Sequence, residues 1–314
     1  MSHSRRFIPL LLCLAAGTGF AARPVIFDTD MGNDIDDALA LAMLHSLTDR
    51  GECELIGVTL TNANAAAVPY IRMINRFYGR PDLPVGAAIR SLKDGAQDGY
   101  MQKALAAASL PVTGNADPAP LVLRRLLTAS REKVIIVQTG FSTNLAALLA
   151  APGGAALAKE KVALVVAMAG NFADGAPEYN VKIDAASAKA VFEQWPTPVI
   201  LSGFEIGRDL LYPAGSIERD FGYARPHPIA ESYRAYQRMP YDRPTWDLTA
   251  ALEAVRPGRY FGQSGTGAVT VEANGVTRFA AGKGDRKYLM LDASRKKEVI
   301  EVLELLSSEP PVRK

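Results

Sequence analysis

The chain has 314 residues, 48% of them hydrophobic, with 35 basic and 33 acidic side chains and a net charge of +2. This length allows a large core in one big domain or two small ones. The balanced charge excludes the electrostatic footprint of a nucleic-acid-binding protein, and the sequence has no basic patch interleaved with aromatic residues. We therefore expect a small-molecule substrate and no nucleic-acid partner.

Residues 1–22 have the features of a secretory signal peptide. A pair of arginines precedes an apolar stretch at 7–16, and a small-residue cleavage site follows. The apolar stretch is shorter than the ~20 residues that a membrane-spanning helix needs. We predict a secreted or periplasmic protein with no membrane association after cleavage and one catalytic domain, residues 23–314. Lipidation of Cys13 is a minor alternative, since a leucine precedes it instead of a small residue.

Short apolar runs rich in β-branched residues alternate with helical patterns along the mature chain. Strands are predicted at 25–27, 55–60, 134–137, 162–168 and 199–201, and helices at 38–44, 65–78, 143–150 and 185–194. Strands that are apolar throughout are typical of a parallel sheet buried on both faces. The pattern predicts an α/β fold with an open, mostly parallel, doubly wound (Rossmann-like) sheet and helices on both faces.

The remaining segments predict smaller elements. Residues 81–118 and 203–245 lack a strong periodicity, and we expect loops or short helices over the sheet there. Asn274-Gly275 is a turn signal that predicts a β-hairpin within 265–292. A charged amphipathic helix is predicted at 294–308.

Five aspartates lie within ten residues directly after the first strand, in Asp28-Thr29-Asp30-Met31-Gly32-Asn33-Asp34-Ile35-Asp36-Asp37. Carboxylates at this density repel one another unless a cation lies among them, and hard oxygen ligands suit Ca²⁺ or Mg²⁺. A helix-capping aspartate in a solvated turn would need one or two acids, not five. The block therefore predicts a bound divalent cation.

Polar residues also follow the other predicted strands: Thr61, Asn62 and Asn64 after the second, then Thr139, then Asn171. Ligands of open α/β sheets bind beyond the carboxyl ends of the strands. We therefore expect these side chains to converge with the aspartates on one pocket.

The acidic block resembles the Asp-x-Asp-x-Gly-x-Asp-Asp signature of the inosine-uridine-preferring nucleoside hydrolases, which cut the N-glycosidic bond of ribonucleosides. Two extra residues separate the glycine from Asp36-Asp37, so Asp34 has no firm counterpart. Three further segments are similar in the same order: Thr139-Gly140-Phe141-Ser142-Thr143-Asn144, then Asn171 followed by Glu178-Tyr179-Asn180, then Asp247 opening a helix.

The resemblance implies Ca²⁺-dependent hydrolysis of ribonucleosides to free base and ribose, in a chain that could form a homodimer or homotetramer. It implies that Asp30 is both the catalytic base and a metal ligand. The other implied ligands are Asp37, Asp247 and the backbone carbonyl of Thr139. The implied ribose-binding residues are Asp36, Asn64, Asn171, Glu178 and Asn180, and Asp28 and Asp34 would support the loop.

The largest departure from the family pattern lies beside Asp247. Many members place a histidine there that can protonate the leaving base, but this chain has Trp246, whose indole cannot supply a titrating proton. Trp246 could stack on the base. Other candidates for holding or protonating the base, among which the sequence gives no order, are Tyr223, Tyr233, Arg238, Tyr241 and Arg243. His227 could lie over the pocket, but we expect it to be an ordinary loop residue. His45 is expected to be a structural helix residue.

Three alternatives accompany this prediction. Another N-ribosyl compound could be the substrate of the same fold. A Mg²⁺-dependent phosphatase of the haloacid-dehalogenase type also sets Asp-x-Asp after a first strand, but it would leave Asp36-Asp37 unexplained. A calcium-binding EF-hand needs a Glu at its twelfth position and a preceding helix, whereas this loop has Leu39 there and a predicted strand before it.

Overall fold

The structure is a computed structural model that describes residues 22–92, 99–111 and 113–312. The predicted signal peptide, apart from its last residue, lies outside the described residues, as does Cys13. No helix in the described ranges is long and apolar enough to cross a membrane.

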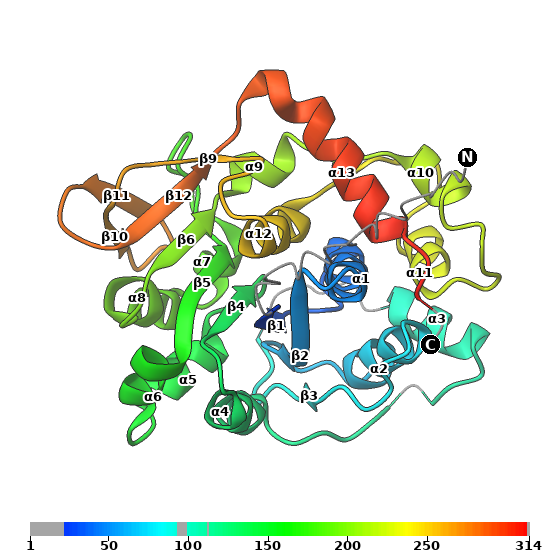
Figure 1. The fold of residues 1–314 in the computed structure, drawn as a ribbon, viewed down its shortest axis with the longest axis horizontal. Coiled ribbons are helices and arrows are strands. Elements are labelled where there is room, and N and C mark those ends of the chain that lie inside the picture. The colour runs from blue at the N-terminus through cyan, green and yellow to red at the C-terminus, as the bar shows by residue number, and fades with distance from the viewer. Residues whose placement is uncertain (1–21, 93–98, 112, 313–314) are drawn as a thin grey trace, which may run out of the picture.

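One mixed sheet with the strand order β11-β10-β12-β6-β5-β4-β1-β2-β3 forms the centre of the protein (Figure 1). Its parallel strands are β1 (Arg23–Thr29), β2 (Cys53–Leu60), β3 (Val85–Gly86), β4 (Val134–Gln138), β5 (Val162–Met168), β6 (Val199–Ser202) and β12 (Arg286–Met290). Val25, Ile26 and Phe27 of the central strand β1 are fully buried. All the strands predicted from apolar runs are confirmed.

Helices cover both faces of the sheet, as the doubly wound prediction requires (Figure 1). The face that includes the larger core packs α1 (Asp36–Asp49), α2 (Ala67–Phe77), α3 (Gly99–Ala107), α12 (Trp246–Val255) and α13 (Lys296–Ser308), the last after the 3-10 turn η1 (Ala293–Arg295). The other face packs α4 (Ala119–Ala129), α5 (Thr143–Ala150), α6 (Gly154–Lys161) and α8 (Ala185–Gln194). The predicted fold class is confirmed.

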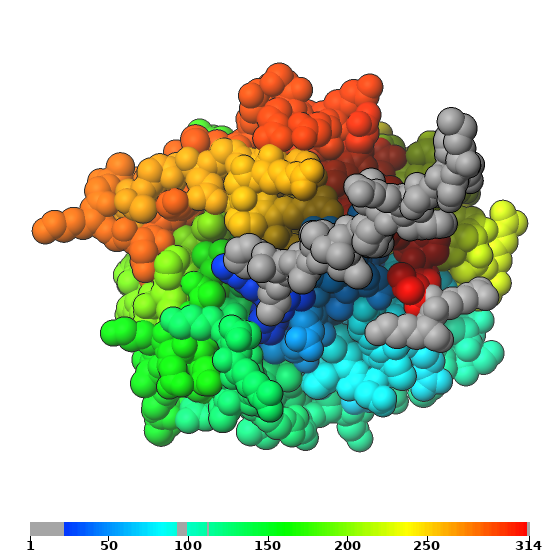
Figure 2. Space-filling view, viewed as in Figure 1, coloured from blue at the N-terminus to red at the C-terminus, as the bar shows by residue number. Residues whose placement is uncertain are grey.

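The C-terminal part adds antiparallel strands to one edge of the sheet. β10 (Gly267–Val271) and β11 (Thr277–Ala281) form the predicted hairpin, and Gly275 in its turn has φ of +88°. This hairpin protrudes at the orange left-hand edge of the molecule in Figure 2. A short strand β9 (Gly262–Gln263) pairs with β12.

The segment between β6 and α12 is built from short pieces, as expected for 203–245. They are α9 (Phe204–Arg208), β7 (Leu211–Tyr212), α10 (Ala214–Arg219), α11 (Pro228–Tyr236) and β8 (Arg243–Pro244). Another short helix, α7 (Tyr179–Ile183), follows β5. These pieces carry side chains to the carboxyl end of the central strands, where the acidic loop lies.

Candidate active site

The acidic loop runs from the end of β1 to the start of α1. Its turn is closed by the N–H of Asn33, which donates to the carbonyl of Asp30 at 3.2 Å. Gly32 has φ of +117°, a left-handed conformation that favours glycine at this turn. The loop ends with Asp36 and Asp37 in the first turn of α1, where the helix dipole favours negative charge.

Gly140 lets the end of β4 approach the acidic loop. A Cβ atom at this position would lie 2.5 Å from the backbone nitrogen of Asp30 and 2.2 Å from the hydroxyl of Thr61. The neighbouring N–H of Thr139 donates to the carbonyl of Asp28 at 2.8 Å. Thr139 is thereby fixed beside the aspartates, as the sequence predicted.

Asp28 lies beneath the site and is fully buried. Its Oδ1 accepts hydrogen bonds from the Thr59 hydroxyl at 2.6 Å and from the Asn144 amide at 2.7 Å. Burial raises the pKa of this carboxyl to about 7. Asp28 therefore links β1 to β2 and α5 by hydrogen bonds. This position is compatible with the supporting role that the family resemblance implies for it.

Asp37 and Asp247 bring two buried carboxylates together from α1 and α12. Asp37 Oδ1 accepts hydrogen bonds from the hydroxyls of Thr29 and Thr139, whereas its buried Oδ2 has no partner among the described residues. Burial first, and then the charge of Asp36, raises the pKa of Asp37 to about 7. Burial and the neighbouring aspartates also raise the pKa of Asp247.

These residues fit a calcium ion. Asp30, Asp37 and Asp247 are buried and act on one another electrostatically, and Thr139 supplies a carbonyl beside them. That carbonyl also accepts a hydrogen bond from the Asn180 amide at 2.8 Å, which leaves its second lone pair available. A donor set made only of oxygens, including a peptide carbonyl, suits Ca²⁺, and the buried Asp37 Oδ2 is an oxygen that such an ion could use.

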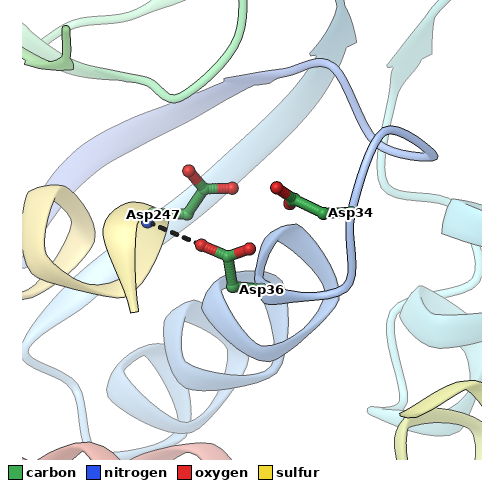
Figure 3. A group of neighbouring side chains, drawn as sticks. All are labelled: Asp34, Asp36 and Asp247. Atoms are coloured by element: carbon green, nitrogen blue, oxygen red, sulfur yellow. Dashed lines mark hydrogen bonds between the residues drawn. The ribbon is translucent and has the colours of Figure 1, made fainter. Parts of the chain in front are cut away.

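Of the three predicted carboxylate ligands, only Asp247 belongs to the one set of acidic side chains in the described residues that lie close enough together to share an ion. Carboxylate oxygens of Asp34, Asp36 and Asp247 lie within 4.8 Å of one another, and Figure 3 shows the three side chains facing one another from the loop, α1 and α12. Asp36 Oδ2 accepts the backbone N–H of Asp247 at 3.2 Å. Arg243 pairs with Asp34 and Asp36 and so compensates part of the negative charge of this cluster, whereas Asp247 has no such pairing with Arg243.

An open pocket of about 330 Å³ adjoins the cluster. Its lining includes seven of the predicted site residues, namely Asp30, Asp34, Thr139, Glu178, Asn180, Trp246 and Asp247. The other predicted site residues do not line the pocket, namely Asp28, Asp36, Asp37, Asn64 and Asn171. A larger cavity of about 650 Å³, beside Phe77 and Tyr223, shares none of these residues in the described part of the chain.

The predicted ribose-binding residues are only partly brought together. Glu178 and Asn180 lie in the pocket wall, but Glu178 also caps α7 by accepting the N–H groups of Asn180, Val181 and Gly170, and burial raises its pKa to about 7. Asn171 closes its own turn by accepting the N–H groups of the two residues Ala173 and Asp174.

Asn64 and Asp36 do not line the pocket. The amide oxygen of Asn64 accepts the N–H of Ala66 at 3.0 Å, which closes a local turn. Asp36 is 1% exposed, and its oxygens are engaged by Arg243 and by the backbone of Asp247. Contact of these two side chains with ribose therefore stays a prediction.

Neither mature-chain histidine reaches the pocket. His227 caps α11 by accepting the N–H of Ile229 at 3.2 Å, bonds to the Tyr223 hydroxyl at 2.8 Å, and is 1% exposed. Burial lowers its pKa to about 3, and His227 does not line the pocket, so the structure favours the expected structural role over protonation of the base. His45 bonds to Asn75 and stacks on Tyr78, as expected for a structural residue.

Of the unranked candidates for the base, the described pocket lining includes Arg243 alone. Tyr233 and Tyr241 donate to each other's backbone carbonyls, so their hydroxyls are used. Trp246 lines the pocket, stacks on Phe204 with ring centroids 5.4 Å apart, and donates its indole N–H to the Phe204 carbonyl. Its position is compatible with the predicted stacking on a base.

Sequence patterns missed several lining residues: Asn33, Met168, Tyr179, Phe204 and Tyr236. Asn33 lies in the acidic block, and Tyr179 lies between Glu178 and Asn180. Their position next to predicted site residues could therefore have indicated them. Phe204 and Tyr236 come from the short helices between β6 and α12, whose packing no local pattern reveals.

Solved structures share this fold. The plant nucleoside hydrolase PpNRh1 has a TM-score of 0.69 and 22% sequence identity, and the alignment covers 92% of this chain and 99% of that one. The type III effector XopQ, solved in complex with adenosine diphosphate ribose, has a TM-score of 0.68 and 18% identity, with 93% and 94% covered.

Sequence comparison gives the same result. The pyrimidine-specific ribonucleoside hydrolase RihA of Salmonella paratyphi B is 30% identical over 212 residues, which are 63% of this chain and 65% of RihA. The chain therefore matches just under two thirds of the length of that relative. The family model for inosine-uridine preferring nucleoside hydrolases matches residues 25–304, which include the acidic loop, Thr139 and Asp247. This chain belongs to the inosine-uridine preferring nucleoside hydrolase family.

Proposed function

We propose that the protein hydrolyses the N-glycosidic bond of ribonucleosides, giving free base and ribose, with Ca²⁺ as its cofactor. The observation that carries the proposal is the presence of Asp30, Thr139 and Asp247 in the lining of one pocket with aromatic residues, with the buried Asp37 next to Asp247. Family membership and the similarity to a pyrimidine-specific ribonucleoside hydrolase support it. They give no support to a haloacid-dehalogenase-type phosphatase, and the strand β1 before the loop excludes an EF-hand.

Calcium held by Asp30, Asp37, Asp247 and the Thr139 carbonyl would lower the pKa of a water molecule and orient it. Asp30 lines the pocket, and we assign to it the role of accepting the proton of that water. The water oxygen bonds to C1′ of the ribose, and the electron pair of the C1′–N bond leaves with the base. The buried carboxylates around the pocket stabilise the positive charge that develops on the sugar.

Recognition of ribose is assigned to the polar wall formed by Glu178 and Asn180. The Asn180 amide nitrogen is held by the carbonyls of Thr139 at 2.8 Å and Met168 at 3.1 Å. Its amide oxygen is thereby oriented away from those carbonyls and is available for a sugar hydroxyl. The pocket lining also includes the aromatic residues Phe204, Tyr236 and Trp246, whose rings suit the flat face of a base.

A different N-ribosyl compound is the second candidate substrate. The specific support is XopQ, a protein of similar fold that was solved with adenosine diphosphate ribose. Against it, the aspartates at this pocket outnumber its arginine, so a pyrophosphate would meet negative charge. We also propose export directed by residues 1–22 and a homodimeric or homotetrameric assembly, to be tested by cell fractionation and light scattering.

The test is a substrate panel with the purified mature chain. Purine and pyrimidine ribonucleosides and adenosine diphosphate ribose are incubated with Ca²⁺ or with a chelator, and released base and free ribose are measured. Release of base and ribose from a ribonucleoside, lost on chelation and restored by Ca²⁺, supports the proposal. Turnover of adenosine diphosphate ribose alone would favour the second candidate, and no turnover of any compound would contradict both.

A further inference from the structure

Arg243 is the one cationic side chain in the described lining of the pocket, which includes no histidine, lysine or cysteine. It comes from β8, a two-residue strand after α11, and its side chain is 13% exposed. A buried arginine keeps its charge at any pH at which the protein is folded. The described pocket lining therefore includes a guanidinium group that stays charged although it is paired with Asp34 and Asp36, and it includes no histidine that could protonate the base.

The position of Arg243 is fixed by carboxylates on one side and aromatic rings on the other. Its guanidinium pairs with Asp34, and with Asp36 Oδ1 at 3.2 Å from Nη2 and 3.3 Å from Nε. The guanidinium carbon lies 5.1 Å from the ring centre of Trp246 and 5.3 Å from that of Tyr236. Cation–π contacts of this kind hold the guanidinium plane against the aromatic wall.

The hydrogen bonds of Arg243 leave one donor for a ligand. Nε–H and both Nη2–H groups are directed to Asp34 and Asp36, and one Nη1–H donates to the Tyr236 hydroxyl at 3.3 Å. A guanidinium carries five N–H donors. Within the described part of the chain, the second Nη1–H has no acceptor.

We propose that Arg243 is a catalytic residue that stabilises the departing base, in place of an acid that protonates it. This inference rests on the proposed function. When the C1′–N bond breaks, its electron pair moves onto the base, which leaves as an anion, and the free Nη1–H of Arg243 donates to a carbonyl oxygen or ring nitrogen of that anion. The proton of the attacking water passes to Asp30, and the base takes a proton from solvent after release.

This role also explains two departures of the chain from the family signature. Asp34 belongs to the two-residue expansion of the acidic loop, and its carboxylate clamps Arg243. Trp246 replaces the histidine of many relatives and supplies one of the two rings against the guanidinium. Asp34 is accordingly a positioning residue, which acts on the base through Arg243.

The first test compares leaving groups in the Arg243→Met and Arg243→Lys variants. On a natural ribonucleoside we expect kcat/KM to fall by about 10²–10³-fold in Arg243→Met, the usual cost of removing one donor to a developing anion. On p-nitrophenyl riboside, whose nitrophenolate leaves without help, we expect a loss below about 10-fold. Arg243→Lys should keep an intermediate nucleoside activity, and Asp34→Asn should show the same leaving-group pattern in a weaker form.

Arg234→Met is the matched control, because Arg234 is exposed on α11, pairs with Glu218 and does not line the pocket. Melting temperatures of all variants identify any that fail to fold. Added guanidinium should restore part of the nucleoside activity of a folded Arg243→Ala variant. A merely structural role of Arg243 would not produce this rescue.

The pH profile of the wild type gives an independent result. With Arg243 as the stabilising group, kcat/KM on nucleosides stays level between about pH 7 and pH 10, since the guanidinium does not titrate there. Equal losses on both substrates in Arg243→Met, or a fall in wild-type kcat/KM at alkaline pH, would overturn the inference while leaving nucleoside hydrolysis intact. A wild type inactive on every riboside would contradict the proposed function itself.

Discussion

The Asp37→Asn substitution should stabilise the metal-free protein at pH 8 and lower the stability of the calcium-bound protein relative to the wild type. Asp37 is buried with one oxygen unpartnered, and its pKa is raised from the ordinary 3.8 to about 7. Between these values the folded chain binds a proton that the unfolded chain has released, so stability is lost as pH rises through this window. The difference of about three pH units corresponds to roughly 4 kcal/mol of stability lost by pH 8.

An asparagine at position 37 avoids that loss. Its amide oxygen can still accept the hydrogen bond from the Thr29 hydroxyl, whereas its NH₂ group is buried without a partner at a cost of roughly 1–3 kcal/mol. In chelator at pH 8 we therefore expect Asp37→Asn to be more stable than the wild type by roughly 1–3 kcal/mol, or about 2–4 °C of melting temperature per kcal/mol. At pH 5 this advantage should disappear, because the wild-type carboxyl is already protonated.

Calcium should reverse the order of stability. The wild type gains about 2.7 kcal/mol at a Ca²⁺ concentration of 100 Kd, whereas Asp37→Asn, with a ligand removed, gains much less. Thermal unfolding at pH 5 and pH 8, with chelator or Ca²⁺, measures all these differences, and Asp82→Asn on the surface is the control. A variant that is less stable than the wild type in chelator at pH 8, and equally stabilised by Ca²⁺, would refute the assignment of Asp37 as a buried metal ligand.

Three further predictions concern activity. Asp30→Asn should lower turnover by at least about 10²–10⁴-fold with little change in folding, because it removes the base and one negative ligand; a variant that keeps more than about a tenth of wild-type turnover would exclude Asp30 as base. The wild type should use 2′-deoxyribonucleosides poorly, since a site built for a hydroxyl is left with unpaired polar groups when it is missing; equal rates on ribose and deoxyribose substrates would contradict this. Trp246→Ala should weaken nucleoside binding by roughly 1–3 kcal/mol, whereas Trp246→Phe should retain most of it; equal binding by both variants would show that the ring does not stack on the base.

The parts of the fold that depend on local pattern were predictable. β5 and α5 have the predicted bounds, because each coincides with an apolar run or a helical pattern bounded by turn residues. α4 was missed although Val122, Leu123 and Leu127 form its buried stripe at helical spacing. The Pro and Gly residues in the preceding segment favour the prediction of loops. The strand β3 has only two residues, which is too short to show a periodic pattern.

The candidate site was predictable where residues follow strands directly. Asp30 and Thr139 come immediately after β1 and β4, and parallel strands bring their carboxyl ends together. The pairing of Arg243 with Asp36 joins positions 207 residues apart, and no spacing in the sequence indicates it. Glu178 accepts hydrogen bonds from three backbone N–H groups because of the path that the chain takes into α7. The sequence pattern does not predict this path.

The central claim is that buried carboxylates around one calcium ion cleave ribonucleosides in this pocket. The most direct measurement is elemental analysis of the purified protein combined with ribose release from ribonucleosides before and after chelation. The account predicts one Ca²⁺ per chain, loss of ribose release with the metal, and recovery of ribose release when Ca²⁺ is added back. Full ribose release from a protein shown to contain no divalent metal would contradict it.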